Sequence, residues 1–308
     1  MAFGYIGVGN MGGAVARKIQ RVEPLVVYDL SAEALARMAD AGATVAGSVS
    51  ELAQACDVIF LCLPTSDHVR GVLFDEGGLA ASARPGTLII DQTSGDPTAT
   101  REMASILAET GIEMVDAPLS GGLKGAEEGT VAIMVGGSEA QFARIHPLLE
   151  AIGPNVFHAG PLGAGNAVKL ANNMVSAAHR LISFEALALA VKHGVEPRRA
   201  MEIFMAGSAR NFFMERFLAP AIVNGDLHSG FSIALMHKDV RLACQLGIEV
   251  GVPLFSGNLV REYFQMCMGL RGRGADVNSI ALVVEQLSGV RMVSDSGEPG
   301  SDPKSSQG

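Results

Sequence analysis

The stretch that most constrains the fold is Gly7–Gly12, which reads GVGNMG. It follows a short apolar run, Phe3–Val8, and precedes a helical pattern, Ala14–Gln20. In a strand–turn–helix unit the first glycine permits a tight turn, the second lets a pyrophosphate approach the backbone, and the third lets helix and strand pack closely. The helix N-terminus then faces the phosphates. The pattern predicts a Rossmann-type dinucleotide site, with a purely structural glycine turn as the alternative; its cofactor-binding residues would be Gly7, Gly9, Asn10, Met11 and Gly12.

Asp29 follows the next strand pattern, Leu25–Tyr28. About 20 residues beyond the first glycine, a carboxylate accepts hydrogen bonds from the adenosine ribose hydroxyls and repels a 2′-phosphate. No arginine follows Asp29 directly. The sequence therefore predicts NAD, with NADP less favoured. In the alternative interpretation, Asp29 only supports the helix that starts near Ser31.

Strand and helix patterns then alternate up to about residue 162, with further strands near residues 57–63, 87–91, 113–116, 131–135 and 156–157. In an open parallel sheet the ligand lies over the carboxyl ends of the strands. Two loops that follow strands are therefore expected to touch the cofactor, through Leu63, Pro64 and Ser94. Residues 1–162 are predicted to form an α/β domain.

The turn Ser120–Gly121–Gly122 follows the strand at 113–116. Its glycines leave backbone N–H groups uncovered, and Ser120 adds one hydroxyl, so the turn is suited to cradling a carboxylate. A flexible turn without a ligand is the alternative.

Residues 163–173, GAGNAVKLANN, open a long helical pattern that runs to about His193. Lys169 and Asn173 are four residues apart, so their side chains share one helix face. Every later pattern is helical. Residues 163–291 are therefore predicted to form an all-α domain, with the long helix between the two domains, and residues 292–308, rich in Ser, Asp, Gly and Pro, to form a disordered tail.

Composition excludes several kinds of partner. The 308 residues carry a formal charge of −9 without a basic cluster, which argues against nucleic acid. Four cysteines without CxxC spacing and seven histidines without a ligand motif predict no metal site. We expect no membrane partner, because no uninterrupted apolar run reaches the roughly 20 residues of a membrane span. The first strand begins near residue 3, so no targeting peptide is expected and the predicted location is the cytoplasm.

Four motifs in order, GVGNMG at 7–12, DAPLSGG at 116–122, GAGNAVKLANN at 163–173 and HKD at 237–239, resemble the β-hydroxyacid dehydrogenase family. This family includes 3-hydroxyisobutyrate dehydrogenase and tartronate semialdehyde reductase. The resemblance implies a Rossmann domain, a long interdomain helix, an all-α domain and a homodimer or homotetramer. It implies that Lys169 is catalytic, that Ser120, Gly121 and Gly122 hold the substrate carboxylate, and that Asn173 holds the substrate. It also places Lys238 near the nicotinamide, flanked by Phe231 and Asp239.

The chain departs from the family pattern at Ser94, which stands where a threonine is usual but keeps the hydroxyl. The leading hypothesis is an NAD-dependent oxidoreductase that interconverts a small 3-hydroxy acid and its semialdehyde or keto acid, with Lys169 as the general acid/base. The alternatives are a relative acting on a sulfonate, a 3-hydroxy amino acid or an imine, and a catalytically silent dinucleotide-binding scaffold. Imine-reducing and silent relatives generally lack the lysine, which is present here. Candidates for further substrate contacts are Leu123, Lys124, Ser176, Phe212 and Phe213, with a place on the surface or in the core as the alternative for each.

Overall fold

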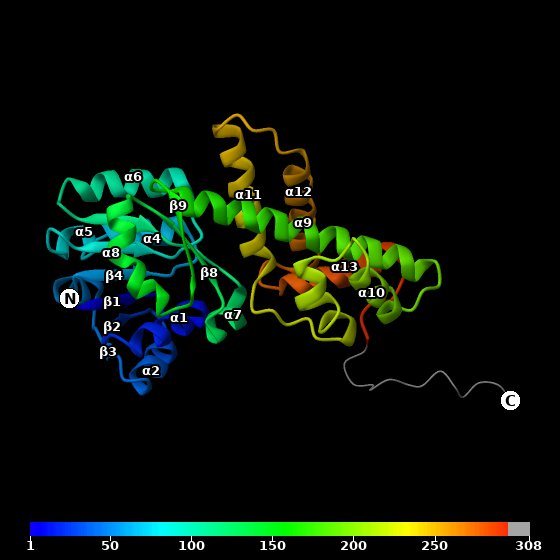
Figure 1. The fold of residues 1–308 in the computed structure, drawn as a ribbon, viewed down its shortest axis with the longest axis horizontal. Coiled ribbons are helices and arrows are strands. Elements are labelled where there is room, and N and C mark those ends of the chain that lie inside the picture. The colour runs from blue at the N-terminus through cyan, green and yellow to red at the C-terminus, as the bar shows by residue number, and fades with distance from the viewer. Residues whose placement is uncertain (295–308) are drawn as a thin grey trace. The chain divides into compact units, whose positions relative to one another are not determined.

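A computed structural model describes residues 1–294, which divide into two compact units (Figure 1). Unit 1 comprises Met1–Asn172, and unit 2 begins at Asn173. The strands of unit 1 are β1 (Phe3–Ile6), β2 (Leu25–Tyr28), β3 (Thr44–Val45), β4 (Val58–Leu61), β5 (Leu88–Asp91), β6 (Glu113–Asp116), β7 (Leu119–Ser120), β8 (Ala132–Gly136) and β9 (Asn155–Gly160). Its helices are α1 (Asn10–Gln20), α2 (Ala32–Asp40), α3 (Val49–Ala55), α4 (Ser66–Phe74), α5 (Leu79–Ser82), α6 (Pro97–Ala108), α7 (Gly122–Glu128) and α8 (Glu139–Glu150).

The sheet of unit 1 has the doubly wound strand order β3–β2–β1–β4–β5–β6, and these strands are parallel. β8 pairs antiparallel with β6 and β7, and β9 runs parallel to β8. The register aligns the last residues of five strands in one row, namely Tyr28, Ile6, Leu61, Asp91 and Asp116. The predicted alternation of strands and helices, with the strand ends at one edge, is confirmed.

Both faces of this sheet are buried, as a parallel sheet requires. Along β4, Val58 and Phe60 join the core that contains residues of α1, α2 and α8, whereas Ile59 and Leu61 join the core formed with α3, α4 and α6. Successive side chains of a strand point to opposite faces of the sheet. Because every residue of β4 is apolar, the strand contributes to the core on each face.

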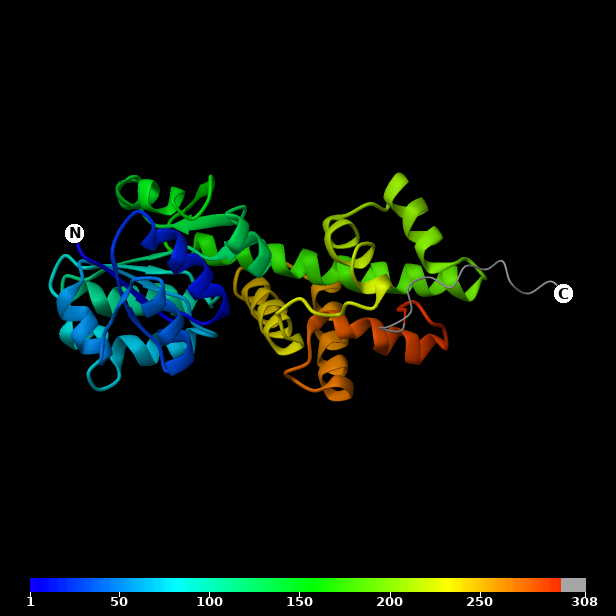
Figure 2. The same ribbon diagram turned by 90° about the horizontal axis from the view of Figure 1, so that it is seen from below.

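Helix α9 (Ala164–Lys192, 29 residues) begins in unit 1 and continues into unit 2 without a break, as the green helix in Figure 2 shows. By length and composition it could cross a membrane, with a mean hydropathy of 1.4 over its most apolar 18 residues. It nevertheless carries the polar residues Lys169, Asn173 and Arg180, and Leu170 and Phe184 are fully buried. A core helix of a globular protein passes the same test of length and composition.

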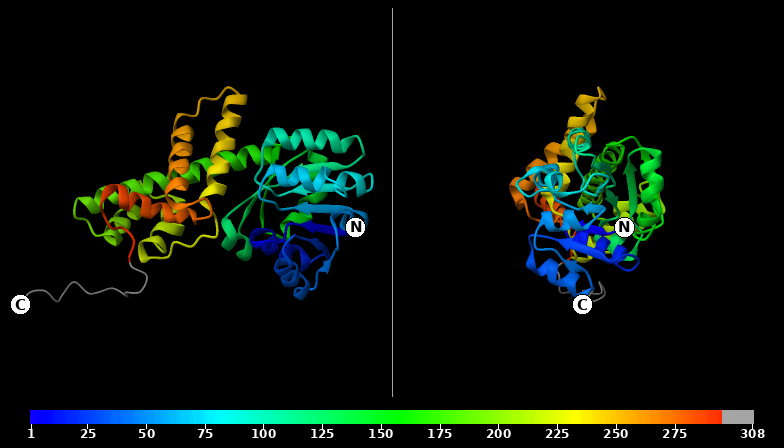
Figure 3. Two further views of the ribbon diagram at one scale, coloured as in Figure 1. Left: turned by 180° about the vertical axis from the view of Figure 1, so that it is seen from behind. Right: turned by 90° about the vertical axis from the view of Figure 1, so that its left-hand side faces the viewer.

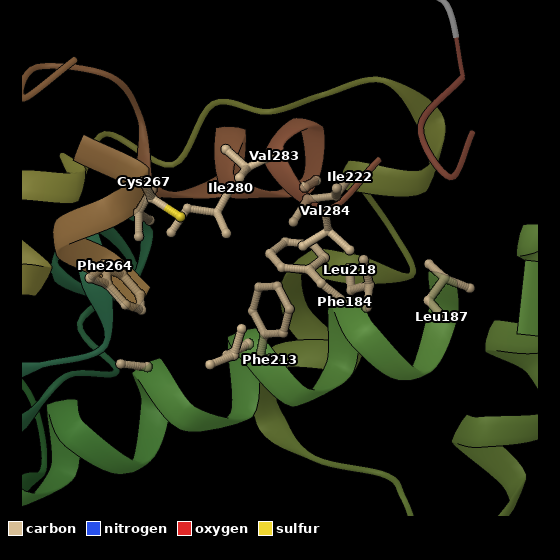
Figure 4. Close-up of a cluster of buried hydrophobic side chains, with 14 of the residues drawn as sticks. Phe184, Leu187, Phe213, Leu218, Ile222, Phe264, Cys267, Ile280, Val283 and Val284 are labelled. Carbon is tan, nitrogen blue, oxygen red and sulfur yellow. The ribbon is translucent and has the colours of Figure 1, made fainter. Parts of the chain in front are cut away.

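Within the described residues, unit 2 is helical. Its elements are α10 (Pro197–Ala206), a π-helical turn (Met214–Leu218), a 3₁₀ turn (Ile222–Asn224), α11 (Ile233–Glu249), α12 (Phe255–Arg271), a second 3₁₀ turn (Val277–Ser279) and α13 (Ile280–Ser288). Figure 3 shows α11 and α12 side by side as a helical hairpin. Phe184 of α9 packs edge-to-face against Phe213, with ring centroids 5.2 Å apart, in the core drawn in Figure 4.

Two expectations for unit 2 are corrected by the structure. The helical pattern expected for the whole domain is interrupted after Phe213, where the π-helical turn and the 3₁₀ turn, with Pro220 between them, take the place of a continuous α-helix. Proline lacks the N–H that a continuous helix would need there. Residues 292–294, assigned to a disordered tail, are packed instead: the backbone N–H groups of Met292 and Val293 donate to the Glu285 carboxylate. The remainder of the predicted tail, 295–308, lies outside the described residues.

Candidate functional site

The glycine turn after β1 has the geometry that a dinucleotide requires. Gly7 has φ = +89°, and a Cβ there would overlap the carbonyl oxygen of Cys62. A Cβ on Gly12 would overlap the carbonyl oxygen of Gly7, whereas a Cβ on Gly9 would meet no atom within 4 Å. Gly7 and Gly12 are thus required by packing, and Gly9 leaves open space above the backbone. Such an open position is what the close approach of a pyrophosphate to the backbone requires.

The N-terminus of α1 is also suited to a phosphate. Its N-cap is Gly9, which offers no side-chain acceptor, and the first turn, which includes Asn10 and Met11, carries no acidic residue. The first N–H groups of a helix have no partner within the helix. Because neither a cap nor a carboxylate competes for them, an anion can bind at this helix end.

Asp29 is fixed at the end of β2 by two backbone groups. Its Oδ2 accepts a hydrogen bond of 2.7 Å from the Val8 N–H, and its Oδ1 accepts one of 2.8 Å from the Ser31 N–H. The cap of α2 is Ser31, whose hydroxyl accepts from the Ala34 N–H. The carboxylate thus joins the glycine turn to the start of α2. It also lies at the end of β2, where a contact with the ribose is predicted, so the structural role and the predicted binding role are compatible.

The loops after β4 and β5 are joined at the same sheet edge. Leu63 donates its N–H to the Thr93 hydroxyl at 3.1 Å, and the Thr93 N–H donates to Asp91 at 2.9 Å. A Cβ on Gly7 would come within 2.9 Å of the Leu63 side chain, so the loop after β4 borders the glycine turn. Pro64 and Ser94 follow in these two loops. Thr93 is the residue that connects the two loops.

The turn after β6 combines glycine geometry with one polar contact. Gly121 has φ = +143° and Gly122 has φ = +70°, which are conformations that side chains disfavour. The Ser120 hydroxyl accepts a hydrogen bond of 3.1 Å from the Asn172 amide of α9. The structure therefore joins the predicted carboxylate cradle to the predicted catalytic helix. Asn172 belongs to the conspicuous stretch 163–173, but its partner could not be read from sequence.

Asp116, at the end of β6, anchors the start of α9. Its Oδ1 accepts from the Gly163 N–H at 2.7 Å, and its Oδ2 accepts from the Asn166 N–H at 2.6 Å. Burial raises the pKa of Asp116 to about 6, against the opposing effect of these hydrogen bonds. A Cβ on Gly165 would overlap the Met134 carbonyl oxygen of β8, so this glycine allows the first turn of α9 to press onto the sheet.

Asn166 links α9 to the loop after β5. It is fully buried, and its Oδ1 accepts a hydrogen bond of 2.9 Å from the Gly95 N–H. Gly95 directly follows Ser94. The loop predicted to touch the cofactor and the helix predicted to carry the chemistry are therefore connected through one amide, which the sequence analysis missed.

Lys169 and Asn173 lie one helical turn apart on α9 and are 8% and 7% exposed. The Asn173 amide donates to Asp239 Oδ2 on α11 at 2.5 Å. Lys238 Nζ lies 3.2 Å from Asp239 Oδ1, an ion pair without hydrogen-bond alignment. Because Asp239 is 1% exposed, the carboxylate of this ion pair is buried. Unit 2 thus fixes the Asn173 side chain through a buried carboxylate.

The structure shows the surroundings of two of the candidates for further substrate contacts. Phe213 is buried in the core of unit 2, and Phe212 is 59% exposed. Within residues 1–294, no group of three or more metal-ligating side chains occurs.

A doubly wound sheet with a glycine turn, an open helix N-terminus and a fixed acidic residue after β2 defines a dinucleotide-binding protein. Residues 2–160 match the NAD binding domain of 6-phosphogluconate dehydrogenase. Residues 163–284 match the NAD-binding domain model of NADP-dependent 3-hydroxyisobutyrate dehydrogenase.

Individual relatives agree with the family models. The chain is 40% identical over 291 residues to 2-(hydroxymethyl)glutarate dehydrogenase of Eubacterium barkeri, covering 93% of this chain and 96% of the relative. It is 38% identical over 271 residues to the NAD-dependent L-serine dehydrogenase of Pseudomonas aeruginosa, covering 86% and 91%. The solved 3-hydroxyisobutyrate dehydrogenase of Mycobacterium tuberculosis with L-serine is similar with a TM-score of 0.82 and 30% identity, covering 92% and 98%.

The chain belongs to the β-hydroxyacid dehydrogenase family. It is an NAD(P)-dependent oxidoreductase of small 3-hydroxy acids, as the sequence analysis predicted.

Proposed function

We propose that Lys169 is the general acid/base, that Ser120, Gly121 and Gly122 bind the substrate carboxylate, and that Asn173 holds the substrate. The observation that carries this proposal is the pair of buried polar residues one turn apart on α9, Lys169 and Asn173. Burying a lysine has a free-energy cost that a solvated helix position would avoid. Such a position is typical of a residue kept for chemistry.

In the oxidising direction, neutral Lys169 accepts the proton of the substrate hydroxyl. The nicotinamide supplies the hydride acceptor when it is bound. The turn at Ser120 orients the carboxylate through its backbone N–H groups, and the side chain of Asn173, held by Asp239, fixes the hydroxyl-bearing carbon. In the reducing direction the protonated amine returns its proton to the carbonyl oxygen. Oxidation should therefore become faster as the pH rises.

We propose NAD as the preferred cofactor, held by the glycine turn, Asp29, Leu63, Pro64 and Ser94, with Lys238 near the nicotinamide. Asp29 supports the preference because a carboxylate at this strand end repels a 2′-phosphate. A catalytic efficiency that is higher with NADP than with NAD would contradict this assignment.

The named relatives narrow the substrate class. 2-(Hydroxymethyl)glutarate, 3-hydroxyisobutyrate and L-serine each carry a CH₂OH group on the carbon next to a carboxylate. We propose that this chain acts on the same unit and interconverts it with the corresponding semialdehyde. One carboxylate cradle and one proton acceptor are enough to recognise and oxidise this unit, because the cofactor performs the hydride chemistry.

The test is NADH formation at mildly alkaline pH with these three acids and the methyl ester of 3-hydroxyisobutyrate. We expect turnover of at least one acid and poor turnover of the ester, because esterification removes the charge that the turn at Ser120 binds. Equal rates for acid and ester would remove the carboxylate cradle from the proposal. Cofactor binding without turnover of any acid would favour the silent scaffold.

We further propose a homo-oligomer, either a dimer or a tetramer. α9 presents Val168, Val175, Ile182 and Leu189 at intervals of seven residues, and all four are between 46% and 74% exposed. Apolar side chains repeated at this interval form a continuous stripe on a helix, and exposed apolar stripes mark interaction surfaces. We expect a second copy of the chain to cover this stripe.

Light scattering coupled to size exclusion tests the oligomer, with Ile182→Glu as the disrupting variant and Glu185→Gln on the same helix as the control. Dissociation of only the first variant would support the stripe as the interface, and a monomeric native protein would contradict the proposal. We also propose a cytoplasmic location. All four cysteines are free thiols, as a reducing compartment favours.

A further inference from the structure

Arg180 is a buried cation on α9. It is 4% exposed, and it follows Asn173 by seven residues, or two helical turns, so both side chains lie on the same helix face. The guanidinium carbon lies 4.5 Å from the centre of the Phe213 ring and 5.6 Å from that of Phe217. Arginine keeps its charge even when buried, so its environment must stabilise that charge.

The polar partners of Arg180 are few. Its Nε and Nη2 both point to one neutral acceptor, Asn278 Oδ1, at 3.4 Å, beyond the usual hydrogen-bond distance. Among residues 1–294, the hydrogen bonds of this guanidinium go from Nε and Nη2 to Asn278 alone, and Asp276 is the one carboxylate that acts on its charge. The other end of the same amide, Asn278 Nδ2, is buried and has no hydrogen-bond partner in this part of the chain. One buried donor of this cluster, Asn278 Nδ2, thus lacks an acceptor, beside a guanidinium whose two bonds go to a single amide oxygen.

The charge nearest to this cluster is already engaged. Asp276 opposes the effect of burial, which lowers the pKa of Arg180 to about 10. Its carboxylate, however, accepts hydrogen bonds from the Ser229 and Gly230 backbone and from the Asn278 N–H. Stacking on phenylalanine rings compensates only part of the cost of burying a guanidinium. Methionine or leucine would fill the same space without that cost, so Arg180 is expected to serve a negatively charged ligand.

We propose that Arg180 and Asn278 bind a second anionic group of the substrate, so that the preferred substrate is a hydroxy acid with a distal carboxylate. The inference rests on the proposed function in one respect, the contact of Asn173 with the substrate. The Cα atoms of Asn173 and Arg180 are about 10.5 Å apart along the helix. The arginine side chain and a short dicarboxylate together can span a separation of this size.

The kinetic test compares 2-(hydroxymethyl)glutarate with 3-hydroxyisobutyrate, because the first carries the distal carboxylate and the second does not. Arg180→Met keeps the length of the side chain and removes its charge. It should lower kcat/KM for the diacid by about 10- to 100-fold, the loss expected for a charged hydrogen bond, and should change that for the monoacid by less than about threefold. Arg180→Lys, which keeps a positive charge, should retain part of the preference for the diacid over the monoacid. The matched control is Arg199→Met on the exposed surface.

A binding test separates this inference from the proposed chemistry. Glutarate lacks the hydroxyl group, so it reports anion binding without turnover. It should raise the melting temperature of the native protein in the presence of NAD, and should raise that of Arg180→Met less. Equal stabilisation of both proteins by glutarate, or equal loss of activity on both acids, would overturn the anion site even if the chain oxidises hydroxy acids.

The stability of Arg180→Met without ligand gives a third readout. An uncompensated buried charge is removed at little cost, so the variant should unfold at about the native temperature or higher. A strongly lowered melting temperature would show that the guanidinium is a structural element of the core and would overturn the proposal.

Discussion

The two stretches of α9 are held by different kinds of contact. The first turns, in unit 1, are fixed by backbone groups: Asp116 accepts two N–H groups at the start of the helix, and Gly165 lets it press on β8. The later turns, in unit 2, are held by side chains such as Phe184, which packs against Phe213 (Figure 4). The stretch of α9 that is proposed to carry chemistry therefore tolerates few residue types, whereas the stretch in the core of unit 2 needs mainly side chains of suitable apolar volume.

The largest expected difference between the two stretches is catalytic. Lys169→Ala should lower kcat by about 10² to 10⁴, the usual contribution of a general acid/base. Its affinity for NAD should stay near native, because the glycine turn and Asp29 hold the dinucleotide. Lys192→Ala, at the far end of the same helix, is the control and should leave kcat unchanged. If Lys169→Ala keeps more than about a tenth of native kcat, Lys169 only positions the substrate and the proton acceptor is another group.

The next effect concerns stability. Gly165→Ala should destabilise the protein by several kcal/mol, because the new methyl group overlaps the Met134 carbonyl oxygen and the helix must shift. Gly269→Ala in α12 is the matched control: no atom lies within 4 Å of its Cβ position, so it should be neutral or stabilise by up to about 1 kcal/mol. Urea unfolding measures both. Equal effects of the two substitutions would mean that the contact of α9 with β8 is not tight.

A smaller effect should appear in the pH dependence of unfolding. Asp116 has a pKa of about 6 in the fold, above its ordinary value of 3.8, so the native state holds its proton more tightly than the unfolded chain. The stability that this group contributes is present below about pH 4 and is lost as the pH rises through about 6. Across that pH range, the free energy of unfolding of the native protein should fall by on the order of 2–3 kcal/mol relative to that of Asp116→Asn.

Urea unfolding of both proteins at pH 4.5 and 7 measures this difference. Asp57→Asn is the control. The Ala2 backbone N–H lowers the pKa of the Asp57 carboxylate, so the stability of the native protein relative to this variant should rise with pH and not fall. A native-minus-variant difference for Asp116 that does not fall with pH would show that its carboxylate is not stabilised in the neutral form.

The smallest predicted effect is on cofactor choice in unit 1. Asp29→Ala should weaken NAD more than NADP and change the ratio of their affinities by about tenfold, or about 1.4 kcal/mol. The variant also loses the carboxylate that accepts from the Val8 and Ser31 N–H groups, so its melting temperature should be measured alongside. Equal weakening of both cofactors would assign Asp29 to the support of the glycine turn alone.

Features that depend on local backbone geometry could be predicted from the amino-acid sequence. Gly7 and Gly12 were recognisable because close packing at their positions excludes a side chain. The bounds of β2 followed from hydrophobic period and turn residues, and so did most of α9. Four motifs in order identified the family before any contact was known, because each motif preserves a turn or a helix face that can be read over a few residues.

The pairs of polar groups that are distant in sequence but in contact could be identified only from the tertiary structure. Asn172 reaches Ser120 across 52 positions and Asn173 reaches Asp239 across 66, and neither partner is implied by the local pattern around the asparagine. The irregular turns after Phe213 and the cluster of Arg180 with Asn278 also escaped the sequence analysis. The physical reason is that a buried polar group takes its partner from whichever chain segment packs beside it, and the packing of distant segments is set by the whole fold.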